Sequence, residues 1–110
     1  MVSYFVRYRG RASDPAAFAH YYETAHAPIL QRFPAIRSLI LHQPTAWHDP
    51  FPVRQDGTAF LAQMMFDTPA DLDRALQSDP RRAARDDFAR FPAFDGDVTH
   101  QAMTATVIFR

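Results

Sequence analysis

The segment TAFLAQMMFD, residues 58–67, constrains the fold most, because the strand it predicts is apolar on both sides. Alternate side chains of a strand face opposite sides of its sheet. One side carries Phe60, Ala62, Met64 and Phe66, and the other carries Ala59, Leu61 and Met65. An antiparallel sheet with one face in water normally alternates apolar and polar residues. Both faces of this sheet are therefore expected to be covered.

Three more strands and two helices are predicted along the chain. Val, Thr and aromatic residues favour strands over 2–9, 35–43 and 98–109. Helices are predicted over 13–33 and 68–91, each with a capping residue and a proline in its first turn. A second cap-like SDP, residues 78–80, predicts a kink in the later helix, and the proline-rich segment 44–57 predicts a long loop.

This order of elements predicts an α+β fold of the ferredoxin-like βαββαβ type, in a single domain over residues 1–110. Its four-stranded antiparallel sheet carries both helices on one face. Leaving four or five apolar side chains of the other face in water would forgo roughly 10 kcal/mol, at about 25 cal/mol per Å² and about 100 Å² each. We therefore expect a homodimer, in which two sheets pack face to face as a dimeric α/β barrel.

The composition excludes several classes of function. Twelve basic and twelve acidic residues cancel, which argues against nucleic-acid and membrane-surface binding. All basic residues are arginine, so lysine Schiff-base chemistry is excluded, and the lack of cysteine excludes disulfides and thiolate nucleophiles. The chain has neither a spanning apolar run nor the pattern of a signal peptide, so a cytoplasmic location is expected.

The first predicted helix contains its own interruption, because His26 stands two residues before Pro28. Proline removes a backbone donor and disfavours helical geometry in the residue before it, so the helix is expected to bend or loosen near Thr24. Such a break can turn His26 toward a cavity, where its imidazole would act as general acid or base. Alternatively, His26 only caps the carbonyl groups that the break frees.

Residues 14–37, DPAAFAHYYETAHAPILQRFPAIR, resemble the hallmark segment of the EthD family, small bacterial proteins of the dimeric α/β-barrel superfamily. The matching residues are Phe18, Tyr21, Tyr22, Glu23, His26, Pro28, Phe33 and Pro34. Residues 65–91 are similar to the second half of the family pattern, and the resemblance is weakest over 44–57 and the last strand. It implies a ferredoxin-like fold, a homodimer and no bound organic cofactor. Related barrels include isomerases, cofactor-free monooxygenases, decarboxylases and dehydratases.

The predicted catalytic residues are His26, which would move a proton, and Tyr21 and His100, which would assist as hydrogen-bond donors. For Tyr21, ordinary packing on an amphipathic helix is the favoured alternative. His26, His42 and His100 could in principle form a metal triad, but no short-range histidine spacing supports one, and no metal site is predicted.

The predicted substrate-binding residues are Tyr22, Phe60, Met64 and Arg7. Tyr22 follows the apolar stripe of the helix, so packing is the favoured alternative for it. Arg7 could hold a carboxylate or an enolate if its face looks into the barrel, and pairing with an acidic residue is the favoured alternative. His48, beside Trp47 in the proline-rich loop, is predicted to be a surface residue; alternatively the loop is a lid with Trp47 as its apolar plug. The mixed charges of residues 81–90 are typical of a solvated helix face.

These patterns predict a cofactor-independent enzyme, of isomerase, lyase or monooxygenase type, that acts on a small apolar oxygenated compound in a barrel pocket. The alternative is a noncatalytic protein that binds a small ligand or accompanies an oxygenase. A third possibility is a structural dimer whose barrel Phe60, Met64 and Phe66 fill completely. A void that reaches His26 would favour the first two.

Overall fold

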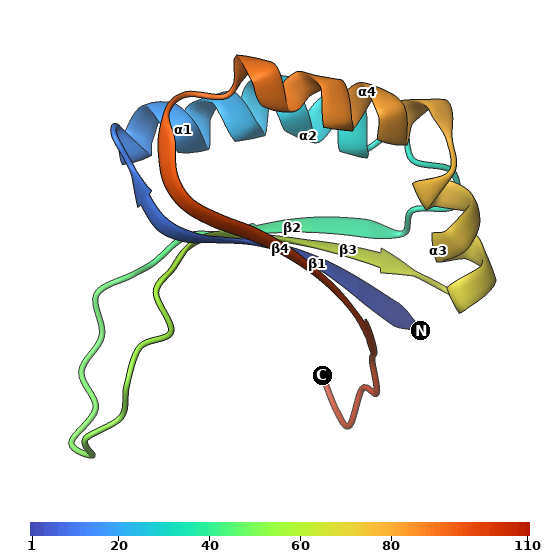
Figure 1. Cartoon of the computed structure of the whole chain (residues 1–110). Helices are drawn as coiled ribbons and strands as arrows, with labels where there is room; N and C mark the ends of the chain where they lie inside the picture. Colours follow the sequence, from blue (N-terminus) through green and yellow to red (C-terminus); the bar gives the residue numbers. More distant parts are fainter.

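The computed structural model describes all 110 residues as a four-stranded antiparallel sheet with helices on one face (Figure 1). The strands are β1 (Val2–Ala12), β2 (Ser38–His42), β3 (Thr58–Phe66) and β4 (Phe94–Thr104), and their order in the sheet is β2-β3-β1-β4. The long strand β1 pairs with both β3 and β4. This arrangement confirms the predicted ferredoxin-like α+β fold.

Both predicted helices are divided where the sequence places a proline. The first consists of α1 (Pro15–Tyr21), the π-helical segment η1 (Tyr22–His26) and α2 (Ala27–Leu30). The second consists of α3 (Pro69–Leu76), α4 (Asp79–Asp87) and the 3₁₀ turn η2 (Phe88–Arg90). Side chains of Asp14, Thr68 and Ser78 accept hydrogen bonds from backbone N–H groups in the first turns of α1, α3 and α4.

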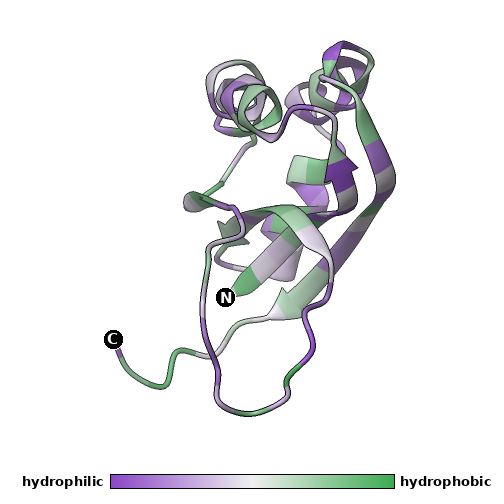
Figure 2. Cartoon of the chain, turned by 90° about the vertical axis from the view of Figure 1, so that its left-hand side faces the viewer, coloured by the Kyte–Doolittle hydropathy of each residue, from purple (hydrophilic) through white to green (hydrophobic).

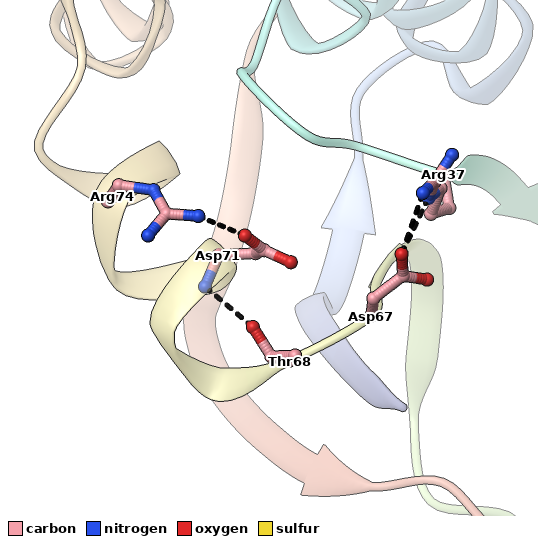
Figure 3. Close-up of polar contacts among 5 residues, drawn as sticks. All are labelled: Arg37, Asp67, Thr68, Asp71 and Arg74. Atoms are coloured by element: carbon pink, nitrogen blue, oxygen red, sulfur yellow. Dashed lines mark hydrogen bonds and ion pairs between the residues drawn. The ribbon is translucent and has the colours of Figure 1, made fainter.

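Polar contacts fix the junction of β3 with α3, which lies at one end of the sheet (Figure 3). The hydroxyl of Thr68 accepts a hydrogen bond from Asp71 N, and the carboxylate of Asp71 pairs with Arg74 one turn later. Arg37, just before β2, donates through Nε and Nη2 to Asp67 Oδ2 at 3.0 and 2.7 Å. These exposed pairs contribute about 0–1 kcal/mol each and mainly fix the ends of the strands.

The core lies between the helices and the sheet and is rich in aromatic rings. The inward side of β3, Phe60, Ala62, Met64 and Phe66, is fully buried, as the pattern predicts. Tyr8 of β1 is 2% exposed at the centre of the core. Its ring lies 5.3–6.3 Å from those of Phe18, Tyr22, Phe60, Phe91 and Phe94. Such contacts account for the positions of α1 and η1 on the sheet.

No helix covers the other face of the sheet. Leu61 and Met65 of β3 are half-buried there, and Ile40 and Met103 are 43% and 51% exposed. Further apolar side chains are exposed at Phe51 in the loop and at Ile108 and Phe109 in the C-terminal segment. That segment is a hydrophobic end projecting from the body of the domain in Figure 2.

The structure corrects the bounds of the last predicted strand. β4 occupies Phe94–Thr104 instead of residues 98–109. The reason is its partner strand, because Ala12 pairs with Phe94 and Val2 pairs with Thr104. Beyond these ends the backbone makes one further bond each way, from Ser13 N to Ala93 O and from Ala105 N to Met1 O. The second strand is also shorter than predicted, at Ser38–His42, since the chain still turns at Ala35, which has a φ of 63°.

The loop between β2 and β3 has no regular structure, as its prolines predict. It extends away from the body of the domain, so Trp47, which is 55% exposed, does not close over the core of its own chain (Figure 1). None of the helices is both long enough and apolar enough to cross a membrane.

Candidate functional site

The helix break that the sequence predicts is a π-turn. Ala27 N donates to the carbonyl of Tyr22, which is an i to i−5 bond, and Pro28 follows in the first turn of α2. The hydroxyl of Thr24 donates to the carbonyl of His20 at 2.7 Å. π-turns within α-helices are often found at functional sites, because the extra residue re-aims the side chains beside it. Here the turn ends at His26, which is 3% exposed.

His26 is held by an aspartate from the second half of the chain. Its Nδ1 lies 2.9 Å from Asp87 Oδ2, and both side chains are buried. Because an ionised carboxylate only accepts hydrogen bonds, Nδ1 of the neutral ring carries the hydrogen. This leaves Nε2 as the unprotonated atom, and it has no hydrogen-bond partner in the chain. His26 can therefore accept a proton at Nε2.

The ring of His26 lies within an aromatic cluster. Its centroid lies 4.8 Å from that of Tyr22, 4.7 Å from that of Phe91 and 5.9 Å from that of Phe88. Burial among these rings lowers the pKa of His26 below its ordinary value of 6.5, and the hydrogen bond to Asp87 opposes that shift only in part. The imidazole is therefore neutral at pH 7.

Asp87 also binds Tyr21, whose hydroxyl donates to Oδ1 at 2.7 Å. Burial alone would raise the pKa of Asp87, but the hydrogen bonds from Tyr21 and His26 outweigh it and lower that pKa. The guanidinium of Arg90 lies 3.9 Å from Oδ1. An ionised Asp87 with two donors can stabilise the imidazolium that forms when His26 takes up a proton, as the aspartate does in a Ser-His-Asp triad.

A pocket between the sheet and the helices reaches His26. It is narrow: the space open to water-sized molecules is about 30 Å³, within about 330 Å³ that includes its open mouth. It is lined by Tyr4, Val6, Tyr22, His26, Leu30, Phe33, Met64, Arg81, Ala84, Arg85, Phe88 and His100. A mainly apolar lining with a few convergent polar groups is typical of small-molecule sites.

The pocket brings together four of the predicted site residues, His26, His100, Tyr22 and Met64. Tyr21 reaches the site only through Asp87, and Phe60 packs behind Tyr22 with ring centroids 4.5 Å apart. Arg7 does not reach this pocket. It lies on the helix-free face of the sheet, where its Nε is 3.9 Å from Asp56 Oδ2. This contact is the pairing with an acidic residue that was the favoured alternative for Arg7.

The three histidines considered for a metal do not converge. His42 lies on the helix-free face of the sheet, where Nε2 is 3.3 Å from Gln63 Oε1, whereas His26 and His100 line the pocket on the helix side. No group of three or more histidine, aspartate or glutamate side chains lies close enough together to hold a metal ion.

The sequence predictions missed three residues of the site, Asp87, Arg81 and Arg85. A signal for Asp87 is present, since it lies three residues after Ala84 and four before Phe91, on the buried stripe of the second helix. A carboxylate in the last turn of a helix is also unfavourable with the helix dipole. A charge in such a place indicates a tertiary partner.

The comparisons with known proteins agree with this fold. A family model described as EthD domain matches residues 11–95. An EthD family protein from Bacillus halodurans is 19% identical, with a TM-score of 0.74 over 96% of this chain and 100% of its own. SnoaB, a cofactor-independent oxygenase from Streptomyces nogalater, is 15% identical, with a TM-score of 0.63 over 96% of this chain and 93% of its own.

A third solved structure is described as a dimeric ferredoxin-like protein of unknown function from Thermobifida fusca. It is 12% identical, with a TM-score of 0.65 over 94% of this chain and 90% of its own. No curated protein matches the chain. At these identities the structural likeness shows the fold.

Proposed function

Because the chain belongs to the EthD domain family, we propose that it is a cofactor-independent enzyme of small-molecule catabolism or secondary metabolism, with His26 as its general base. The observation that carries the proposal is the buried contact between His26 Nδ1 and Asp87, which leaves Nε2 as the basic atom at an apolar pocket. The substrate would be a small, largely apolar oxygenated compound.

The proposed chemical step is a proton transfer from carbon. Nε2 of His26 takes a proton from the carbon beside a carbonyl group, the C–H bond breaks, and its electron pair moves into the carbonyl oxygen to give an enolate. The imidazolium formed in this way is stabilised by Asp87, and His26 is regenerated when it returns the proton. Isomerisation, elimination and reaction of an enolate with oxygen can all begin in this way.

This step can be tested without knowing the natural substrate, through deuterium exchange in D₂O. We expect the wild-type protein to exchange the benzylic hydrogens of phenylpyruvate or 2-tetralone faster than buffer, measured by proton NMR. The chain has no lysine, so exchange through a lysine imine is excluded. Because burial lowers the pKa of His26, the protein-dependent rate should stay constant down to about pH 6.5 and fall only in more acidic solution.

The outcome separates the enzyme from the alternative, a noncatalytic ligand-binding protein. Chemical-shift changes at the pocket without faster exchange would support binding alone and would overturn the proposed base. The third possibility, a barrel packed solid, predicts neither faster exchange nor chemical-shift changes at the pocket. A protein-dependent rate that already falls above pH 6.5 would point to another base, because the pKa of His26 is lowered.

We also propose that two copies of the chain pair through the helix-free face of the sheet. Support comes from the apolar side chains on that face and from the structural neighbour that is described as dimeric. The wild type should sediment as a dimer at micromolar concentration. Met65→Glu, which places a charge on this face, should weaken the dimer about a hundredfold or more, because an unpaired carboxylate would be buried.

The matched control for the dimer is Ala70→Glu, which adds the same charge at an exposed position in α3, away from the helix-free face. This variant should remain dimeric. A wild type that sediments as a monomer, or equal weakening by both variants, would show that the face is not an interface.

A further inference from the structure

The side of α4 that faces the pocket carries two guanidinium groups without an ionic partner. Arg81 and Arg85 are one helical turn apart, and both line the pocket. None of the six ion pairs in the chain includes either residue, although Arg82 beside them pairs with Asp79. Of the charged residues in 81–90 that form no ion pair, Arg81 and Arg85 line the pocket and Asp86 is exposed outside it.

Local helix energetics do not explain this pair of arginines. Like charges four residues apart on a helix repel each other. Arg81 also lies in the first turn of α4, where the helix dipole disfavours a positive charge. Residues that oppose local preference commonly serve a function, so the reason for the pair should be sought in the pocket that it lines.

Arg85 is exposed and Arg81 is partly exposed, so both stand at the open side of the pocket. The guanidinium carbon of Arg85 lies 5.1 Å from the centroid of the Phe88 ring, a cation–π contact that orients it, and Arg81 is half-buried. Across the pocket stands His100 of β4. Burial, followed by the charges of Arg81 and Arg85, lowers the pKa of His100.

On the basis of the proposed function, we propose that the substrate is a small aromatic or similarly flat acid whose carboxylate binds Arg81 and Arg85. The guanidinium fork matches the two oxygens of a carboxylate, and it is less hydrated than an ammonium group. The body of the ligand would enter the pocket beside Leu30, Phe33 and Met64, and these buried side chains would have to move apart to admit it. In this orientation the acid group stays at the mouth and the rest of the molecule extends toward His26.

The test compares two probes of nearly equal shape, 2-naphthoate and its neutral amide, 2-naphthamide. Each is titrated into the protein labelled with ¹⁵N at neutral pH, and binding is followed by chemical-shift changes of pocket residues. We expect the acid to bind about tenfold more tightly than the amide or better, as charge-assisted hydrogen bonds provide. Arg81→Gln and Arg85→Gln should each weaken binding of the acid only, and the double variant should bind both probes equally.

Arg82→Gln is the matched control, because Arg82 lies on the same helix but pairs with Asp79 outside the pocket. It should leave both affinities unchanged. A second readout is the pKa of His100, which should rise in the double variant as the two positive charges are removed. The proposal is overturned if acid and amide bind equally, if Arg82→Gln has the same effect, or if the shifts map outside the pocket.

Binding of naphthoate does not depend on proton transfer, so the two proposals fail separately. Acid-selective binding without deuterium exchange would overturn the catalytic role of His26 and keep the acid site. Deuterium exchange without acid-selective binding would keep the catalytic role of His26 and overturn the acid site. If the arginines instead hold an acidic group of a second copy, their substitution would weaken the dimer and the acid would not bind.

Discussion

His26→Gln is expected to reduce the deuterium exchange that the wild type catalyses by about 10²- to 10⁴-fold, the range that a positioned general base supplies. Glutamine is the better substitution than alanine, because its amide N–H can still donate to Asp87. Alanine would leave that buried carboxylate with Tyr21 as its remaining hydrogen-bond donor. The variant should therefore stay folded, which a proton NMR spectrum checks. The measurement is the exchange rate of phenylpyruvate or 2-tetralone in D₂O.

The matched control is His20→Gln, at an exposed histidine of α1 that has no side-chain hydrogen bond. It should exchange like the wild type. If His26→Gln keeps more than about a tenth of the wild-type rate, His26 is not the base, since even a modest general base contributes more than that.

Asp87→Asn tests how His26 is prepared for this role. The asparagine amide can donate to Nδ1, which would move the ring hydrogen to Nε2 and remove the basic atom from the pocket. The ¹⁵N shifts of the ring should report this change of tautomer, together with a loss of exchange. Asp86→Asn, one residue earlier and exposed, should change neither property. An unchanged tautomer in Asp87→Asn would show that Asp87 does not set it.

The fold could be predicted from the sequence because the local patterns of the strands and helices agree with their order along the chain. Alternation placed the buried side of β3 correctly, and Pro28 located the π-turn that ends at His26. The partner of His26 could not be read in this way, because Asp87 is 61 residues away. His26 and Asp87 meet only because α4 packs against α2, and no pattern in the local sequence predicts that contact.

The ends of the strands were less predictable for a related reason. The composition of residues 98–109 favours extended structure throughout, but a strand continues only while its neighbour offers backbone partners. β1 begins at Val2, so the ladder of β4 ends at Thr104, followed by one last bond from Ala105 N to the carbonyl of Met1. At the other end, β4 begins four residues earlier than predicted because Asp95, Gly96 and Asp97 pair with β1 despite their low strand propensity.

Gly96 is the residue that permits this early pairing, and Gly96→Ala is expected to destabilise the protein by more than about 4 kcal/mol. Gly96 lies opposite Gly10, has a φ of 153°, and a Cβ there would lie 1.9 Å from the carbonyl oxygen of Arg9. The obstacle is backbone, so β4 would have to separate from β1. Native domains are stable by only about 5–15 kcal/mol, so a urea titration should show a large loss or an unfolded chain.

Gly57→Ala is the matched control, because Gly57 also has a positive φ, of 79°, but a Cβ there meets nothing within 4 Å. It should cost only about 1 kcal/mol, through backbone strain alone. If the two variants lose similar stability, the close approach of β1 and β4 is not a feature of the native state. The same approach aligns His100 opposite Val6 on the pocket side of β4, so a folded Gly96→Ala protein should also show altered His100 resonances and weaker binding of 2-naphthoate.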